Sequence, residues 1–174
     1  MKKLLLHTLL LSVSVLPAQV VTFTNEYAIW GESHCAHNLR QTIDGGYIFT
    51  ADAVPEMDTA VNPLAYAYLV KIGAGGATQW IKSFPKSDFF IKPFDANCVC
   101  AASDGGYLMA TCFYSSQYPA SSNNPARILL VKTDAAGNQL WSYIYPGLGL
   151  SACYCVNETT DHGFIVCGET ADSV

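Results

Sequence analysis

Hydrophobic residues in this chain alternate with a period of two over short stretches. The clearest example runs from residue 65 to residue 72, where the odd and the even positions are both largely apolar. A period of two indicates a β-strand, and two apolar faces indicate a sheet that is covered on both sides. No stretch after residue 18 keeps a helical period. The pattern therefore predicts an all-β fold.

Two short motifs recur in register along the chain. Residues 44–48 read Asp-Gly-Gly-Tyr-Ile, residues 104–108 read Asp-Gly-Gly-Tyr-Leu, and residues 161–165 read Asp-His-Gly-Phe-Ile. A Leu-Val-Lys motif occupies residues 69–71 and 130–132, and in both copies a tryptophan follows nine residues after the lysine. The two motifs together predict a tandem repeat of about sixty residues.

Each repeat is predicted to contain four strands: one before the Asp turn, one after it, the Leu-Val-Lys strand, and the strand with the tryptophan. Asp accepts hydrogen bonds from the backbone ahead of it, and Gly supplies positive φ. The predicted structural turn residues are Asp44, Gly45, Gly46, Asp104, Gly105, Gly106, Asp161 and Gly163. The predicted core includes Ile48, Val70, Trp80, Leu108, Val131, Trp141 and Ile165.

The first eighteen residues are interpreted as a signal peptide. Lys2 and Lys3 precede an apolar run, and Pro17-Ala18 offers a cleavage site, so the mature chain is predicted to begin near Gln19. A membrane anchor is the alternative, but the apolar run is short for a spanning helix. We therefore expect a secreted or cell-surface protein with no membrane span.

The charge of the mature chain argues against nucleic-acid partners. Loss of Lys2 and Lys3 leaves seven basic residues (9 minus 2) against 14 acidic ones, which takes the formal net charge from -5 to -7. A nucleic-acid-binding protein needs a basic surface to bind the phosphates of the backbone. The expected partners are an unknown protein or glycan ligand.

The two motifs resemble the repeats of secreted propeller-like proteins common in Bacteroidetes, many of which end in a type IX secretion sorting domain, absent here. The resemblance implies tandem four-stranded antiparallel blades of a β-propeller. The predicted blades cover about residues 35–84, 95–145 and 152–174, the last incomplete, and residues 20–30 form a lone strand. About two and a half blades cannot close a ring, so we expect a fragment of a larger propeller or self-association through exposed strand edges.

Seven cysteines follow the predicted signal peptide, and an exported chain meets oxidants that allow disulfides. Cys98 and Cys100 lie two apart on one predicted strand, as do Cys153 and Cys155, so each pair shares a face. The sequence leaves three alternatives for these cysteines: buried thiols, disulfides or a zinc site. If bridges form, the candidates are Cys98 with Cys112 and Cys155 with Cys167, each across one Asp turn.

The other polar clusters favour structural roles over chemistry. The turn aspartates are expected to accept hydrogen bonds from their own backbone. Calcium binding is the alternative that their recurrence raises. Residues 34–37, His-Cys-Ala-His, are expected in a solvent-facing loop, because no acidic motif adjoins them to orient an imidazole. Trp80 and Trp141 lie at the same distance in sequence from the Leu-Val-Lys motif, which favours a role in packing over a role in stacking on sugars. No catalytic residue, metal site or cofactor is predicted.

These observations predict a secreted, non-catalytic propeller module for binding, adhesion or surface display. The alternative is part of a glycan-active secreted enzyme whose site lies in blades outside this chain.

Overall fold

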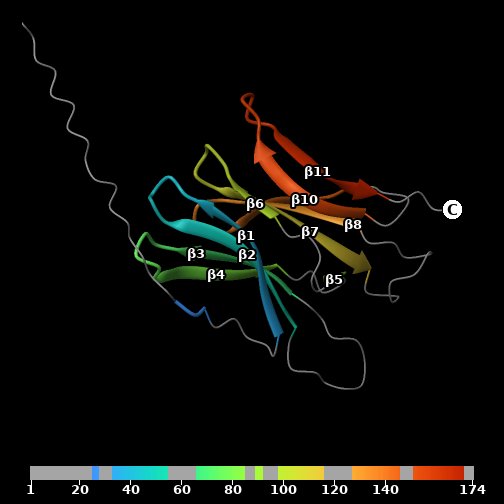
Figure 1. The fold of residues 1–174 in the computed structure, drawn as a ribbon. Helices are drawn as coiled ribbons and strands as arrows, with labels where there is room; N and C mark the ends of the chain where they lie inside the picture. Colours follow the sequence, from blue (N-terminus) through green and yellow to red (C-terminus); the bar gives the residue numbers. More distant parts are fainter. Residues whose placement is uncertain are drawn as a thin grey trace, which may run out of the picture.

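The computed structural model describes residues 25–27, 33–54, 66–84, 89–91, 98–115, 127–145 and 151–170. The regular structure of these residues is entirely β, which confirms the predicted class (Figure 1). The strands are β1 (Ser33–Gln41), β2 (Tyr47–Val54), β3 (Tyr66–Ile72), β4 (Thr78–Phe84), β5 (Phe89–Ile91), β6 (Cys98–Ala101), β7 (Tyr107–Ser115), β8 (Arg127–Thr133), β9 (Gln139–Tyr145), β10 (Ser151–Glu158) and β11 (Phe164–Thr170).

The strands form three antiparallel sheets, one for each predicted repeat. The first sheet has the order β1-β2-β3-β4. The second has the order β6-β7-β8-β9, and the short β5 pairs with the other end of β7 on the same side as β6. The third consists of β10 and β11. The four-stranded units predicted for the first two repeats are therefore present.

The sheets agree in some details of their strand pairing. Lys71 lies opposite Trp80, Lys132 lies opposite Trp141, and the register shifts directly after each lysine. The first strands also match, since β1 shifts just before Asn38 and β10 shifts just before Cys155, each six residues ahead of the turn aspartate. A bulge adds a residue to one strand and increases its twist. Each of the two shifts thus recurs in two of the three sheets, whereas β6 pairs with β7 without a shift.

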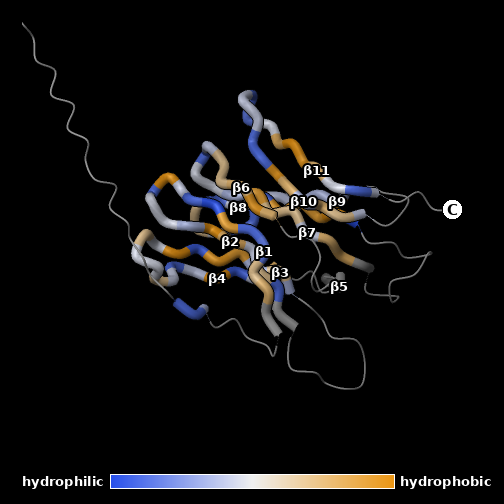
Figure 2. The backbone as a smooth tube through the Cα atoms, viewed as in Figure 1, coloured by the Kyte–Doolittle hydropathy of each residue, from blue (hydrophilic) through white to orange (hydrophobic). Residues whose placement is uncertain are grey.

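Buried hydrophobic residues form two layers between the sheets and a third cluster on the first sheet, made of Phe49, Ala51, Val70 and Ile72. Figure 2 shows hydrophobic stretches along the strands. The layer between the first and second sheets contains Ile48, Ala67, Leu69, Val99, Tyr107, Met109, Phe113, Leu129 and Val131. The layer between the second and third sheets contains Cys98, Cys100, Leu108, Ala110, Ile128, Cys153 and Val156. Alternate residues of β7 point into different layers, so the second sheet is buried on both faces, as the period-two pattern predicts.

Two of the residues predicted for the core are exposed. Ile48, Val70, Leu108 and Val131 are buried, which confirms them, and Trp80 is half-buried. Trp141 is 42% exposed and Ile165 is 59% exposed, so these two predictions are wrong. Trp141 lies on β9, at the edge of the second sheet, whereas β10 packs on β6, β7 and β8. Ile165 alternates with Phe164 and Val166, which face the second sheet, and so points away from it.

The N-terminal part is described only at residues 25–27. These residues are not in a strand, although a lone strand was expected over residues 20–30. The Asn25 amide and the Tyr27 hydroxyl both donate to the carbonyl of Gly76, at 3.0 and 2.8 Å. The expected signal peptide, residues 1–18, lies outside the described residues. In the described residues, no helix has the length and hydrophobicity needed to cross a membrane.

Candidate functional site

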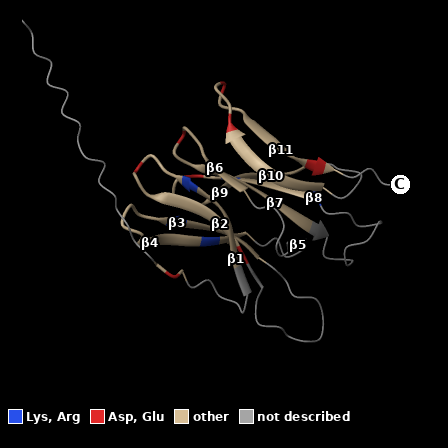
Figure 3. Cartoon of the chain, viewed as in Figure 1, with Lys and Arg blue, Asp and Glu red and all other residues tan. Residues whose placement is uncertain are grey.

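The three Asp turns lie at the same end of their sheets, where the hairpins β1-β2, β6-β7 and β10-β11 project together (Figure 1). In each turn the Asp Oδ1 accepts a hydrogen bond from the backbone N–H two residues later. The N···O distances are 3.1 Å at Asp44, 2.8 Å at Asp104 and 3.2 Å at Asp161. Acidic groups therefore mark the hairpin tips (Figure 3).

A buried lysine anchors each of the first two turns. The Nζ of Lys71 donates to both carboxylate oxygens of Asp44, at 3.1 and 2.9 Å, and Lys132 donates to those of Asp104, at 3.0 and 2.7 Å. Each ammonium also donates to a carbonyl of its own strand, that of Ile72 or Thr133. The lysine side chains are 3% and 5% exposed. A buried ammonium must be paired, so these turns require their aspartates.

These ion pairs change the titration of the aspartates. Hydrogen bonds from Lys71 and Thr42 lower the pKa of Asp44 well below its usual range, and the Lys132 bond lowers that of Asp104. Sequence reasoning did not assign the lysines a role. The signal was present, because the Asp-to-Lys separation is 27 residues in one repeat and 28 in the next. Both carboxylates are bound by their own scaffold, which favours a structural role for the recurrent charges.

The third turn is held differently, by a polar cluster that it shares with the second turn. Glu158 accepts from the backbone N–H of Ser103 at 2.7 Å and from its hydroxyl at 2.8 Å. The Nδ1 of His162 lies 3.0 Å from the same hydroxyl. The Ser103 bonds lower the pKa of Glu158.

Serine, histidine and glutamate together invite comparison with a nucleophilic triad. In a triad the imidazole stands between the hydroxyl and the carboxylate, using one nitrogen for each. Here Glu158 binds Ser103 directly, and the imidazole of His162 approaches both groups through the same Nδ1 atom, 3.7 Å from the Glu158 carboxylate. The geometry is that of a clamp between two hairpins.

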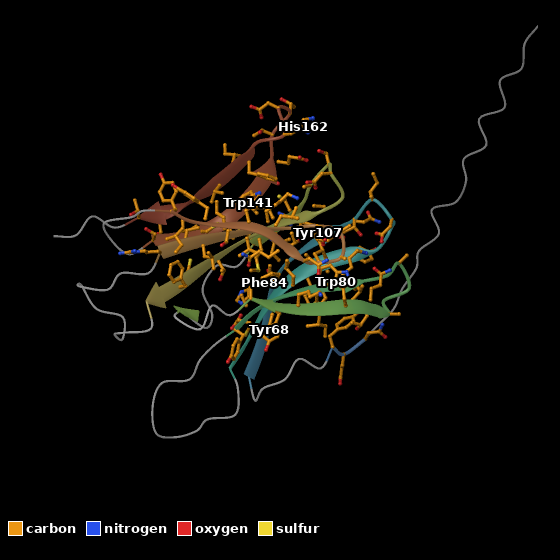
Figure 4. The ribbon with its side chains drawn as sticks, turned by 180° about the vertical axis from the view of Figure 1, so that it is seen from behind. Tyr68, Trp80, Phe84, Tyr107, Trp141 and His162 are labelled. Carbon is orange, nitrogen blue, oxygen red and sulfur yellow. The ribbon has the colours of Figure 1, made fainter. Side chains whose placement is uncertain are left out.

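Aromatic side chains connect each sheet to the next (Figure 4). The rings of Trp80 and Tyr107 are 5.8 Å apart, and those of Trp141 and Phe164 are 6.5 Å apart. Tyr107 and Phe164 both lie three residues after a turn aspartate. The same pair of positions therefore packs at both interfaces, and Trp80 has the packing role predicted for it.

An exposed aromatic row runs along β9. Trp141, Tyr143 and Tyr145 occupy alternate positions, so they share one face of the strand, and all three are exposed. The matching face of β4 is half-buried. Beside the row, a groove of about 380 Å³ opens between the second and third sheets. Its lining includes Ile128, Leu130, Tyr145, Phe164, Val166 and Glu169.

His37 lies on a strand, so the expected solvent-facing loop over residues 34–37 is wrong. The residue belongs to β1, where its Nε2 is hydrogen-bonded to the buried carboxylate of Asp52 on β2. The acidic partner lies fifteen residues away and is brought close by the hairpin. An apolar groove of about 330 Å³ beside His37 is lined in part by Tyr27, Tyr47 and Phe49.

All seven cysteines are thiols in the structure. Cys155 and Cys167 lie opposite each other in the third sheet, whereas Cys98 lies opposite Ala110, two residues before Cys112. The two expected bridges stay predictions. The Sγ atom of Cys98 contacts the Sγ atom of Cys153, which lies in the third sheet. Among the described residues, no group of three or more His, Cys, Asp or Glu is placed to hold a metal ion.

Comparison with known proteins adds no family to this description. No protein-family model matches the chain, and no curated protein matches it significantly. The candidate sites therefore stand on their geometry.

Proposed function

We propose that this chain is a non-catalytic module of a propeller-type repeat protein, which acts outside the cytoplasm in binding, adhesion or surface display. The recurrent Asp, Gly and Lys residues build and lock turns, and the tryptophans lie at the sheet interfaces. These repeated residues form a scaffold, so ligand contacts fall to side chains that differ between repeats.

The arrangement of the first strands supports the propeller type. β6 contacts β1 on one side and β10 on the other. The Asn38 side chain accepts from the backbone N–H of Val99 at 3.4 Å, which joins the first strands of the first two units. Radially packed blades place their first strands next to one another around a centre. The contacts of β6 with both β1 and β10 support this arrangement.

The aromatic row on β9 is the observation that carries the binding role. Its neighbouring members lie about 7 Å apart along the strand, because each residue advances about 3.3 Å. Trp and Tyr present large, rigid surfaces with a polar tip, which suit them to interfaces. The corresponding positions in the first repeat are Trp80, Lys82 and Phe84, so the exposed row belongs to the second repeat alone among the two four-stranded units. A surface protein or a glycan is the expected ligand.

The test compares a variant in the aromatic row with a control variant at an exposed hydrophobic residue outside it. The full chain is exported, purified, and assayed on arrays of polysaccharides and of cell-surface proteins. We expect Tyr143→Ala combined with Tyr145→Ala to weaken binding at least tenfold, because aromatic anchors dominate interfaces and neither tyrosine is repeated in the first sheet. Ile165→Ala is the matched control, since Ile165 is also an exposed hydrophobic residue but points away from the second sheet. Equal binding by both variants would contradict the proposed surface.

Release of reducing sugar from any polysaccharide on the array would oppose the non-catalytic assignment. The Glu158→Gln variant addresses this directly, because it removes the carboxylate from the Ser103 clamp. We expect it to leave ligand binding unchanged. Sugar release by the parent chain that disappears in Glu158→Gln would show an enzyme instead.

A further inference from the structure

Two cysteines face each other between the second and third sheets. Cys98 lies on β6 and Cys153 lies on β10, the first strands of consecutive repeats. Their Sγ atoms are 3.1 Å apart, and the residues are 1% and 0% exposed. A disulfide bond measures about 2.05 Å, so the two atoms need to approach by only about 1 Å.

The surroundings of this pair fit a bridge better than a metal. Leu108, Ala110 and Val156 pack in the same cluster as the two cysteines. A structural zinc ion takes four ligands, and no third His, Cys, Asp or Glu among the described residues completes such a set. A disulfide, in contrast, is apolar and needs no further partner.

We propose that Cys98 and Cys153 form a disulfide that joins the second and third sheets when the chain folds in an oxidising compartment. The oxidant is a disulfide, either a small one such as oxidised glutathione or that of a dithiol oxidase. One cysteine thiolate attacks it, forms a mixed disulfide and releases the first thiol of the oxidant. The second cysteine thiolate then displaces the other thiol. Two protons and two electrons leave the cysteines, and one oxidant disulfide becomes two thiols.

Burial determines when this reaction takes place. The two thiols lie in apolar surroundings, which disfavour a charged, reactive thiolate. A dissolved oxidant also cannot reach two sulfurs that are 1% and 0% exposed. The bridge therefore forms while the third sheet is still open, and the folded, reduced protein oxidises slowly.

The bridge differs in kind from one between Cys155 and Cys167. Those residues face each other within a single hairpin, twelve residues apart in sequence (167 minus 155). Cys98 and Cys153 are 55 residues apart and lie in different sheets. A longer closed loop restricts the unfolded chain more strongly. The proposed bridge holds one repeat to the next, which a hairpin bridge does not.

The test uses the full chain, reduced and unfolded, then refolded in a glutathione redox buffer. Remaining thiols are blocked with N-ethylmaleimide, and the digested protein is analysed by mass spectrometry. We expect a linked peptide pair containing Cys98 and Cys153, which would exclude the expected bridge between Cys98 and Cys112. A second linked pair of Cys155 with Cys167 would be compatible with the proposal. Reduction of the bridge should lower the thermal midpoint by about 10 °C. Maleimide on both residues, or linkage of either to a different cysteine, would overturn the proposal.

Two variants separate the bridge from a general effect of reductant. In a chain that also carries Cys167→Ala, Cys98→Ala combined with Cys153→Ala should unfold at the same temperature with and without reductant. Cys167→Ala should retain both the linked peptide and the response to reductant. If the double variant does not fold, the parent chain with and without reductant still gives the answer. A reductant response that persists in a folded double variant would place the bridge elsewhere.

Discussion

The first two Asp turns and the third share one motif but are held by different forces. At Asp44 and Asp104 a buried lysine from the third strand of the same sheet reaches under the turn. At Asp161 the described sheet has two strands, and the carboxylate bonds to Thr159 and to the N–H of Gly163. The local motif thus specifies the shape of the turn, while the neighbouring strand supplies the charge that anchors it.

The backbone conformation also differs between the first two turns and the third. Gly45 and Gly105 have φ of 78° and 84°, and the equivalent residue of the third turn is His162, at φ 64°. A non-glycine residue in this region costs roughly 1 kcal/mol. The histidine also reaches the clamp at Ser103. The third turn is therefore adapted to contact the neighbouring hairpin, whereas the first two are adapted to a lysine of their own sheet.

The largest expected difference concerns the second glycine of the motif. A Cβ on residue 106 would lie 2.1 Å from the carbonyl of Thr133 and 2.7 Å from the Nζ of Lys132. We expect Gly106→Ala to lower the free energy of unfolding by about 3 kcal/mol, since backbone must move. Gly163→Ala meets side-chain oxygens at 3.0 Å or more and should cost less than about 1 kcal/mol. Urea unfolding measures both, and equal losses would contradict the distinction.

Removal of the carboxylates should give the next largest difference. Asp104→Asn leaves the buried ammonium of Lys132 without a counter-charge, and we expect a loss of about 2 kcal/mol, less than for a fully buried pair because Asp104 is half-exposed. Asp161→Asn strands no cation and should have a much smaller effect. Asp104→Asn combined with Lys132→Met should recover part of the loss in urea unfolding. A double variant less stable than Asp104→Asn would argue against the stranded charge.

The smallest difference is expected in the pH dependence of stability. The pKa of Asp44 is lowered from 3.8 by the hydrogen bond from Lys71, so the unfolded chain binds its proton more tightly than the folded one does. The stabilisation is therefore present above the unfolded pKa and is lost as pH falls toward the folded value. The same holds for Asp104.

Urea midpoints recorded between pH 6 and pH 3 give the measurement. We expect the midpoint of the parent chain to fall over this range, and the combined Asp44→Asn and Asp104→Asn variant to fall less steeply. Asp161→Asn should alter the slope less, because the pKa of Asp161 is lowered mainly by the hydroxyl of Thr159 and not by a cation. Identical slopes for all three proteins would show that the ion pairs do not control acid stability.

The sequence alone determined the all-β class, the strands and the turns. These features depend on residues close together in the chain: alternation gave the strand between residues 66 and 72, and Asp followed by Gly gave the hairpins. The sequence also predicted correctly that Val70 and Leu108 belong to the core. Both residues lie on interior strands of their sheets and are buried.

Only the tertiary structure decided which distant side chains meet. Strand pairing carries Lys71 to Asp44 and Asp52 to His37, and sheet stacking carries Cys98 to Cys153. Stacking also leaves Trp141 exposed while its counterpart Trp80 is half-buried, although the two occupy the same position in the repeat. Period and turn chemistry are local, whereas burial and pairing depend on the extent of the neighbouring sheet and on the register between strands far apart in sequence.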